Sequence, residues 1–490
     1  MKKSKWIHGI VLFLGCVITS LFYIINSPRR FVACEGLLLF VVLGITFVLW
    51  KKGRKYYGFF LLFAVAFIIR SGYIIYTPTW IRQHDVIGFG AGFGQAGYIE
   101  YFYNNWKLID FDPRNLWGFF QPPLHHILAA IWLKINVLVG FQYNHACENV
   151  QVLTLLYAYL MTVYAYKILK EMKVEGRALL AGIALVALHP CFILLSGSIN
   201  NDMLCILLQV MGIYYFLRWY KNMDFQSIVL LALCVGGSMM AKLSGILIAP
   251  AIAVVFLLQL CKKKENFKKL FVQYIVFGMI SVPIGVWSPL RNYFKFSVPL
   301  TYTPKVGEPV NSFSMIQRIF DIRTSTPFTN LIVNGNSYDE YNIPLTMLKT
   351  SLVGEYNYAS LVEVTTPFAW FLLVAGAILM LITFLVTVYY LFPKNSVLES
   401  GVKIFLGVYY FTSIAFYVNL CFKIPNFSSQ DFRYIAFLIV IEAVFLSIFF
   451  QDKKDGKIFF ILKKLTAICL VIFCISSAMV YFLLGLNGYH

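Results

Sequence analysis

Long apolar stretches separated by short polar segments make up most of the chain. An α-helix rises 1.5 Å per residue, so about 20 apolar residues cross the roughly 30 Å hydrocarbon core of a bilayer. The first stretch is too long for a signal peptide and has no small-x-small cleavage site, so we expect it to stay as a membrane helix. The pattern predicts thirteen spanning helices, near 7–26, 31–50, 57–76, 150–169, 177–196, 201–218, 226–241, 243–260, 270–290, 365–391, 402–421, 432–450 and 464–486.

The apolar stretch 122–141 is the difficult one, and the basic loops decide it. Lysine and arginine concentrate in cytoplasmic loops. Two crossings, 57–76 and 150–169, already separate the first basic cluster from the second, so a third crossing would put them on opposite sides. We therefore predict that 122–141 lies at the outer interface without crossing. The clusters are Lys51, Lys52, Arg54, Lys55; Lys167, Lys170, Lys173, Arg177; Lys262, Lys263, Lys264, Lys268, Lys269; and Lys453, Lys454, Lys457.

This topology places the N-terminus, with Lys2, Lys3 and Lys5, in the cytoplasm and the C-terminus outside. All cytoplasmic loops are then short, which leaves no cytoplasmic domain for a nucleotide sugar or ATP. Two long external segments remain, near 77–149 and 291–364. The domains that we expect are an N-terminal helix pair (1–56), a core that includes the first external loop (57–290), an external segment (291–364) and C-terminal helices (365–490).

Composition supports a membrane protein and argues against nucleic acid as a partner. The chain has 490 residues, of which 60% are hydrophobic and 13% charged, whereas a soluble protein has about 25% charged residues. The net charge of +19 is confined to short loops and does not follow a helix face or an RNA-binding sheet. Most of the ten cysteines lie inside apolar stretches, so no disulfide framework or paired-cysteine metal site is expected.

Ionisable residues gather at the predicted outer ends of the helices. Such residues cost about 2.5–3.5 kcal/mol at the centre of a spanning helix, so they mark function by default. For any one of them, snorkelling to the interface is an equally good explanation. Because they share one level, we interpret the set as a site, and only Glu442 is expected near the middle of the membrane. The set is Glu35, Arg70, Asp202, Lys242, Arg291 and Arg433.

The first external loop holds the densest group of candidate residues. Position alone leaves two readings of Asp85 open: a general base at the membrane boundary, or a helix cap or ion pair with Arg82. His125 and His126 are adjacent, so on a helix they point about 100° apart and cannot both face one metal. A divalent metal between them, His84 and Asp85 is the weaker alternative, and we assign no metal ligand.

A glycine-rich stretch in the same loop matches a dinucleotide fingerprint by accident. Gly92-x-Gly94-x-x-Gly97 has the right spacing. No strand precedes it, no βαβ unit surrounds it, and it lies outside the cell on this topology. These glycines are better explained by a flexible loop or by close approach of helices.

Together these residues resemble the GT-C superfamily of membrane glycosyltransferases, and within it glycosyltransferase family 39. Asp85 matches the first acidic residue of the family's motif, while Val86 replaces the second one. Gln121-Pro122-Pro123-Leu124 resembles the family's His-Pro-Pro-Leu motif, which begins a juxtamembrane helix that does not span. Later matches cover Asn201-Asp202, Lys242 in Ala-Lys-Leu-Ser-Gly, Pro289-Leu290-Arg291-Asn292-Tyr293 and Asp431-x-Arg433-Tyr434.

The resemblance implies an all-α GT-C-like bundle that moves a sugar from a polyprenyl-phosphate donor, with inversion, at the external face of a bacterial cell membrane. A general base and cations for the departing phosphate suffice, because polyprenyl phosphate is already a fair leaving group. Asp85 would be the base, and Lys242, Arg291 and Arg433 would bind phosphate. The substrate-binding residues would be His84, Gln121, His125, His126, Asp202 and Tyr434. The acceptor would be a glycan, lipid or protein. No cofactor is assigned, and a divalent metal stays the weaker alternative.

Two other functions use the same ingredients. A transporter or flippase of lipid-linked glycans predicts polar groups and broken helices near the midplane, and often an internal repeat, which is not visible here. A glycan polymerase or ligase also uses lipid-linked sugars and has a similar external loop. The position of the charges at the outer face favours the transferase over the transporter.

Overall fold

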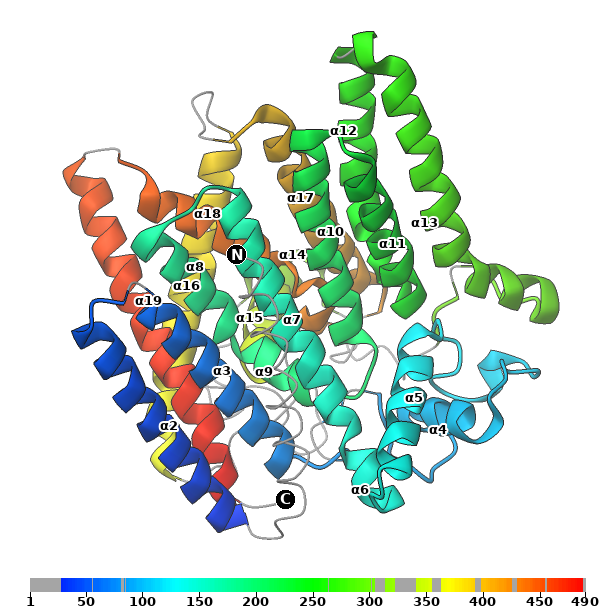
Figure 1. Ribbon diagram of the computed structural model, residues 1–490, viewed down its shortest axis with the longest axis horizontal. Helices are drawn as coiled ribbons and strands as arrows, with labels where there is room; N and C mark the ends of the chain where they lie inside the picture. The colour runs from blue at the N-terminus through cyan, green and yellow to red at the C-terminus, as the bar shows by residue number, and fades with distance from the viewer. Residues whose placement is uncertain are drawn as a thin grey trace.

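The computed structural model describes most of the chain, and every regular element in the described residues is helical. It covers residues 28–54, 56–80, 83, 85–262, 264–300, 302–304, 313–321, 341–354, 363–392, 398–424, 430–453 and 456–487. The predicted helix 7–26, together with Arg82 and His84, lies outside these residues. Figure 1 shows the long helices side by side, with α4 (Gly94–Asn105), α5 (Leu124–Leu138) and α6 (Tyr143–Glu148) gathered at one end of the bundle.

Each of the twelve predicted spans within the described residues is an apolar helix or helix pair. In the part of the chain that the structure describes, nine helices are long enough to cross a membrane, and the bent pair α8–α9 would make a tenth. Helices α11 and α18 are shorter. The remaining helices are α2 (Pro28–Lys51), α3 (Tyr57–Tyr76), α7 (Val150–Glu171), α8 (Gly176–Ala187), α9 (Pro190–Gly197), α10 (Asp202–Asn222), α11 (Phe225–Ala241), η2 (Leu243–Ile248), α12 (Ala249–Lys262), α13 (Phe267–Phe296), α14 (Met315–Phe320), α15 (Ile343–Val353), α16 (Thr366–Leu391), α17 (Ser400–Lys423), η7 (Phe432–Ile435), α18 (Leu438–Gln451) and α19 (Lys457–Leu483).

The ambiguous apolar stretch 122–141 contains only the short helix α5. Its 15 residues extend about 22 Å, less than the hydrocarbon thickness. It packs on α4, α6 and the start of α7. The loops that carry the first two basic clusters lie at the same end of the bundle, since the Phe59 and Tyr166 rings next to them are 5.6 Å apart. The fourth cluster joins the second there, because the Gln451 amide donates to the Lys173 carbonyl at 3.1 Å. This arrangement agrees with the parity of crossings that the basic loops require.

A bent helix stands where the sequence predicted the straight span 177–196. Helices α8 and α9 meet at 45°, because Pro190 has no N–H to continue the helix. The break frees carbonyl oxygens at the end of α8, and Arg70 of α3 donates to those of Val186 and Ala187 at 3.4 and 2.9 Å. We expected Arg70 among the outer-face charges of a site. Inside the bundle it instead donates hydrogen bonds to the backbone carbonyls that the break leaves without a helical partner.

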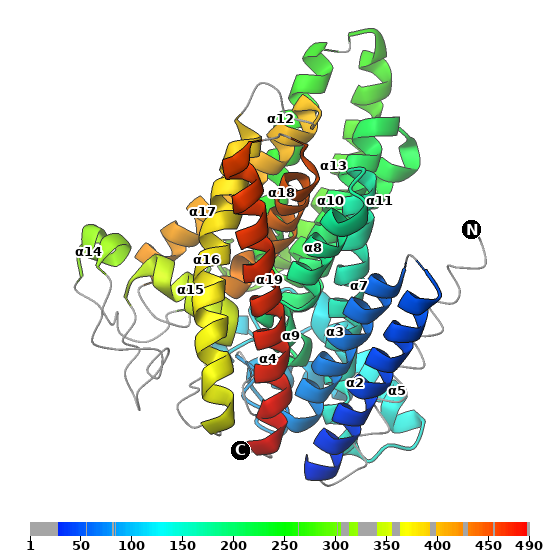
Figure 2. The same cartoon turned by 90° about the vertical axis from the view of Figure 1, so that its left-hand side faces the viewer.

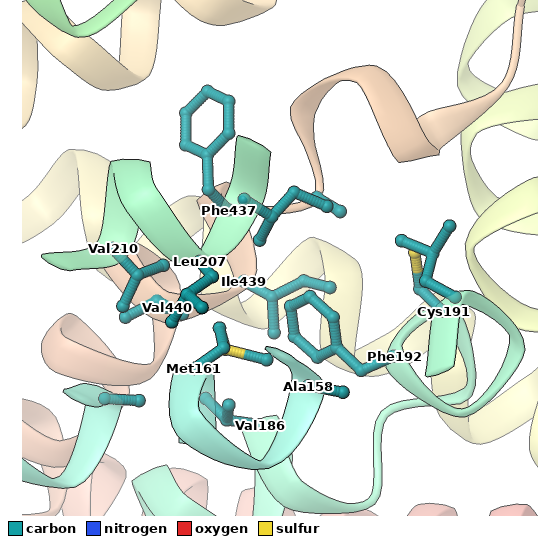
Figure 3. Close-up of a cluster of buried hydrophobic side chains, with 14 of the residues drawn as sticks. Ala158, Met161, Val186, Cys191, Phe192, Leu207, Val210, Phe437, Ile439 and Val440 are labelled. Carbon is teal, nitrogen blue, oxygen red and sulfur yellow. The ribbon is translucent and has the colours of Figure 1, made fainter. Parts of the chain in front are cut away.

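The centre of the bundle is a dry core that joins the helices carrying the candidate residues. Figure 3 shows Met161 of α7, Phe192 of α9, Leu207 of α10 and Ile439 of α18 packed together, each at most 4% exposed. Small residues let the helices approach closely: a Cβ on Gly182 would lie 2.1 Å from the Ser447 hydroxyl. This packing fixes the start of α10 relative to α18.

Part of the segment 291–364 packs within the bundle. Helix α15 contacts α9, α16 and η7, and its Thr350 hydroxyl accepts a hydrogen bond from the Phe432 backbone N–H at 2.9 Å. Figure 2 shows α15 beside α16, with α14 farther out, and α16 and α19 running together along their lengths. Helix α15 therefore supports the short η7 helix.

Candidate active site

Three helix ends and the loop that follows α3 meet at the end of the bundle opposite the basic loops. Asp85 follows α3 in the first long loop, and Asp202 is the first residue of α10. Lys242 caps the C-terminus of α11, and Arg433 lies in η7 before α18. Their side chains form one ionic cluster, which we call the helix-end cluster, although up to 348 positions separate them in the sequence.

Arg433 connects the two carboxylates of the helix-end cluster. Its Nη2 lies 3.0 Å from Asp85 Oδ2, and its Nη1 lies 3.6 Å from Asp202 Oδ2. Lys242 Nζ contacts the other oxygen of Asp202. The side chains of Arg433, Asp202 and Lys242 are only 2%, 3% and 13% exposed, whereas that of Asp85 is 37% exposed. Asp85 is thus the most accessible of these four side chains.

Tyr434 and Asp431 complete the cluster. The Tyr434 ring lies 4.4 Å from Lys242 Nζ, an attractive cation–π contact, and its hydroxyl accepts from Arg433 Nη2 at 3.3 Å. Asp431 caps η7 through the Arg433 backbone N–H at 2.8 Å, and its carboxylate lies 3.8 Å from Arg433 Nε. Asp431 was not among our predicted site residues, although it begins the Asp-x-Arg-Tyr motif that the sequence displays.

The cluster carries one more carboxylate than it has cations, so its cations stay protonated. Burial by itself would lower the pKa of Lys242, but the neighbouring Asp202 carboxylate raises it above its ordinary value. Asp202 in turn stands at the N-terminus of α10, where the helix dipole favours a negative charge. Lys242 and Arg433 are therefore permanent positive charges at this site.

The backbone around Asp85 is held by two neighbouring elements. The side chain of Gln83 donates to the Gly197 carbonyl at 2.7 Å and accepts from the Ile199 N–H at 3.0 Å. The Asp85 carbonyl accepts from the Gln95 N–H at the start of α4, at 3.0 Å. Asp85 itself has φ +58°, a left-handed conformation that aspartate tolerates.

Gln121, His125 and His126 fasten α5 to this region. The Gln121 side chain accepts from the Asn201 amide at 3.2 Å. His125 Nε2 donates to the Ile199 carbonyl at 2.8 Å, and His126 Nε2 lies 2.5 Å from Gln95 Oε1. Both histidines are fully buried, and burial lowers the pKa of His125 to about 4. The two rings are thus neutral and bonded to the protein, although we expected them to contact substrate.

Arg291 does not join the helix-end cluster in the part of the chain that the structure describes. Its guanidinium donates to the Ile109 carbonyl and to the Asn292 side chain, the latter at 3.3 Å, and it packs on the Phe296 ring. Of the three cations that we expected to converge on phosphate, the structure brings together Lys242 and Arg433. Arg291 ties the end of α13 to the loop that follows α4 instead.

Glu35, which we expected at the outer face, and Glu442, which we expected near the middle of the membrane, have other surroundings. Glu35 is buried against Gly72 of α3. Glu442 accepts hydrogen bonds from Tyr410 and Thr383 at 2.7 and 2.8 Å. Among the described residues, no three side chains of the metal-binding types are grouped as ligands.

Comparisons with known proteins bear on the fold. Residues 121–287, about a third of the chain, match the family model described as dolichyl-phosphate-mannose-protein mannosyltransferase. No curated protein is a significant match. ArnT from Cupriavidus metallidurans in the apo state is 11% identical, with a TM-score of 0.49 over 87% of this chain and 76% of that one.

An oligosaccharyltransferase from Archaeoglobus fulgidus is also similar. Its apo form is 14% identical, with a TM-score of 0.50 over 87% of this chain and 56% of that one. The form tethered to an acceptor peptide has a TM-score of 0.51 at 14% identity, over 87% and 55% of the two chains. The chain thus spans little more than half the length of that enzyme. The family match and the shared fold confirm the resemblance to the GT-C superfamily and, within it, to family 39.

Proposed function

We propose that this GT-C-like chain is a membrane glycosyltransferase, which moves a sugar from a polyprenyl-phosphate donor to an acceptor hydroxyl at the external face of the cell membrane. The matched family model takes its description from a dolichyl-phosphate-mannose donor, which belongs to the same chemical class. The observation that carries the proposal is the helix-end cluster, where one accessible carboxylate adjoins two buried cations.

Asp85 is the general base in this proposal. The acceptor oxygen attacks the anomeric carbon, the bond from that carbon to the phosphate oxygen breaks, and the anomeric configuration inverts. The electron pair leaves with polyprenyl phosphate, and the acceptor proton passes to the Asp85 carboxylate. A side chain in this role must reach the hydroxyl directly or through one water, and the partial exposure of Asp85 permits this.

Lys242 and Arg433 hold the phosphate. Charge-assisted hydrogen bonds from ammonium and guanidinium groups stabilise the negative charge that develops on the leaving group. Because Arg433 contacts Asp85 before the donor arrives, phosphate binding draws Arg433 from Asp85 and leaves that carboxylate available to the acceptor. Arg291, which the sequence analysis assigned to phosphate binding, instead anchors the external loop through the Ile109 carbonyl.

The location of the cluster favours an enzyme over a transporter or flippase. The charged groups stand at the helix ends, and the one broken helix in the described residues, α8–α9, has its free carbonyls occupied by Arg70. A transporter is expected to present such a break to its substrate near the midplane. The same location accommodates a polymerase or ligase of lipid-linked glycans, which differs only in its acceptor.

Transfer assays on the purified protein in nanodiscs test the proposal. Radiolabelled polyprenyl-phosphate sugars are supplied with an extract of cell-envelope acceptors, and the released polyprenyl phosphate is measured with wild-type protein and with Asp85→Asn. Mass spectrometry of envelope glycans from cells with and without the protein then identifies the sugar and the acceptor. Movement of labelled lipid across the bilayer without release of polyprenyl phosphate would instead establish a flippase.

A further inference from the structure

Asp202 is buried together with the two cations. Its side chain is 3% exposed, against 13% for Lys242 and 2% for Arg433. One carboxylate oxygen contacts Lys242 Nζ, and the other lies 3.6 Å from Arg433 Nη1. Asp202 is thereby the one described residue whose carboxylate contacts both cations.

Asp202 is itself fixed before any ligand arrives. The Asn200 side-chain Nδ2 donates to Asp202 Oδ2 at 2.9 Å, and the Asn200 side-chain Oδ1 accepts from the Asp202 backbone N–H at 3.0 Å. Asn201 extends the arrangement to α11, because its amide donates to the Ala241 carbonyl at 2.8 Å, next to Lys242. The start of α10 therefore holds the end of α11 by both a backbone contact and an ion pair.

From this geometry we propose that Asp202 is a positioning residue, which holds the ammonium of Lys242 and the guanidinium of Arg433 together so that both face a phosphate. It touches neither the donor nor the acceptor, in contrast to the substrate contact that its sequence position indicated. This inference rests on the proposed function, since it assumes a phosphate-bearing donor.

The physical argument concerns the freedom of the two long side chains. Lysine and arginine lose considerable rotamer entropy when they are fixed. A buried counter-ion fixes them during folding, so that less of this cost falls on donor binding. Tyr434 restricts Lys242 from another side through its ring, but as a neutral group it does not neutralise the buried charge.

Binding of undecaprenyl phosphate in detergent micelles tests the proposal. We expect Asp202→Asn to weaken this binding, and to raise the KM for donor, by about 10- to 30-fold, a range that the rotamer entropy of one long side chain can supply. The pH profile of kcat should keep the wild-type shape, because the base is unchanged. Asp202→Glu, which keeps the charge, should recover part of the loss. Asp224→Asn, which alters a cap at the other end of α11, is the matched control and should leave binding unchanged.

Two outcomes would overturn the proposal. Unchanged affinity in Asp202→Asn would mean that the cations do not depend on Asp202. Tighter binding would mean that Asp202 competes with phosphate for them.

A double-mutant cycle keeps the test independent of the proposed function. Thermal unfolding of Asp202→Asn, Lys242→Met and the double variant measures the coupling of the pair without any ligand. If Asp202 and Lys242 are coupled but the wild-type protein binds no lipid phosphate, the proposed donor is refuted and the ion pair stands. Absence of coupling would refute the positioning role itself. Asn200→Ala, which loosens Asp202 without changing any charge, serves if Asp202→Asn does not fold.

Discussion

Asp85 differs from the other carboxylates of the helix-end cluster in its access to solvent. It is 37% exposed, while Asp202 and Asp431 are 3% and 2% exposed. It shares its cationic partner, Arg433, with those two carboxylates. Access to a reacting hydroxyl is what a general base needs, and position along the sequence could not separate the two readings of Asp85.

Replacing Asp85 with asparagine should abolish most of the transfer. We expect kcat to fall by about 10²- to 10⁴-fold, the usual contribution of a general base. Asparagine has nearly the same volume and can still accept a hydrogen bond from Arg433, so folding and donor binding should persist. Asp112→Asn is the control, since Asp112 pairs with the neighbouring Arg114 in the external loop. Near-normal kcat in Asp85→Asn would remove the catalytic assignment, even for a protein that proves to be a glycosyltransferase.

Lys242 and Arg291 should respond differently to removal of their charge. Lys242→Met takes away a phosphate-binding cation and should raise the KM for donor by at least tenfold. Arg291→Met removes the bond to the Ile109 carbonyl and should lower the thermal stability with little change in this KM. Donor titrations and melting curves of the two variants decide the matter. Equal effects on donor binding would restore Arg291 to the phosphate site that the sequence assigned to it.

At the scale of elements, α5 is held in place by neutral histidines, and this makes its docking sensitive to pH. Burial lowers the pKa of His125 to about 4, while in the unfolded chain it is about 6.5. Between these values the unfolded state binds more protons than the folded state. The free energy of unfolding should therefore fall, by on the order of 3 kcal/mol, as the pH drops from about 6.5 to 4, and should be insensitive to this group above 6.5.

Thermal melts from pH 4 to 8 check the histidine contribution. His125→Gln keeps a donor for the Ile199 carbonyl but cannot titrate. It should therefore reduce the dependence of the free energy of unfolding on pH between about pH 4 and 6.5. His145→Gln, in the neighbouring α6, is the control and should retain the slope. An unchanged slope in His125→Gln would show that other groups cause the dependence.

The glycine-rich stretch acts through close packing. A Cβ on Gly97 of α4 would lie 2.6 Å from the Gly92 carbonyl carbon, and one on Gly94 would lie 2.5 Å from the Val86 carbonyl oxygen. Gly97→Ala should therefore destabilise the protein by about 1–3 kcal/mol, as overpacking does. Gly44→Ala in α2 has open space around it and should stabilise slightly through helix propensity. Equal melting temperatures for the two variants would contradict this account.

At the scale of the whole molecule, the alternation of basic loops and the short α5 together predict the topology. Cysteines introduced at Lys52 and Arg177 should label from the same side of the membrane in intact cells, and a cysteine at Asp110 should label from the other side. The background requires replacement of the native cysteines that label, among which Cys34 and Cys261 are exposed. Labelling of Lys52→Cys and Arg177→Cys from opposite sides would mean that the chain crosses the membrane once more between them, and would separate Asp85 from the rest of the cluster.

The sequence alone determined where the apolar helices lie, because the energy of a spanning helix depends on its own composition. Helix α3 was predicted at 57–76 and is observed at Tyr57–Tyr76, and the parity of basic loops predicts that the short helix α5 does not cross. The resemblance to the GT-C superfamily followed from short motifs placed in a fixed order along the chain.

Contacts between distant segments were decided only by the tertiary structure. Arg70 and Arg433 are both cations near helix ends in the sequence. Arg70 donates to a carbonyl at the break between α8 and α9, whereas Arg433 contacts Asp85 and Asp202. Arg291 shares the predicted depth of Lys242 but turns to a loop carbonyl. Depth along a helix can be predicted from composition, whereas the direction of a side chain around it depends on which neighbours the packing supplies. For this reason the pairing of charges within the site required the assembled bundle.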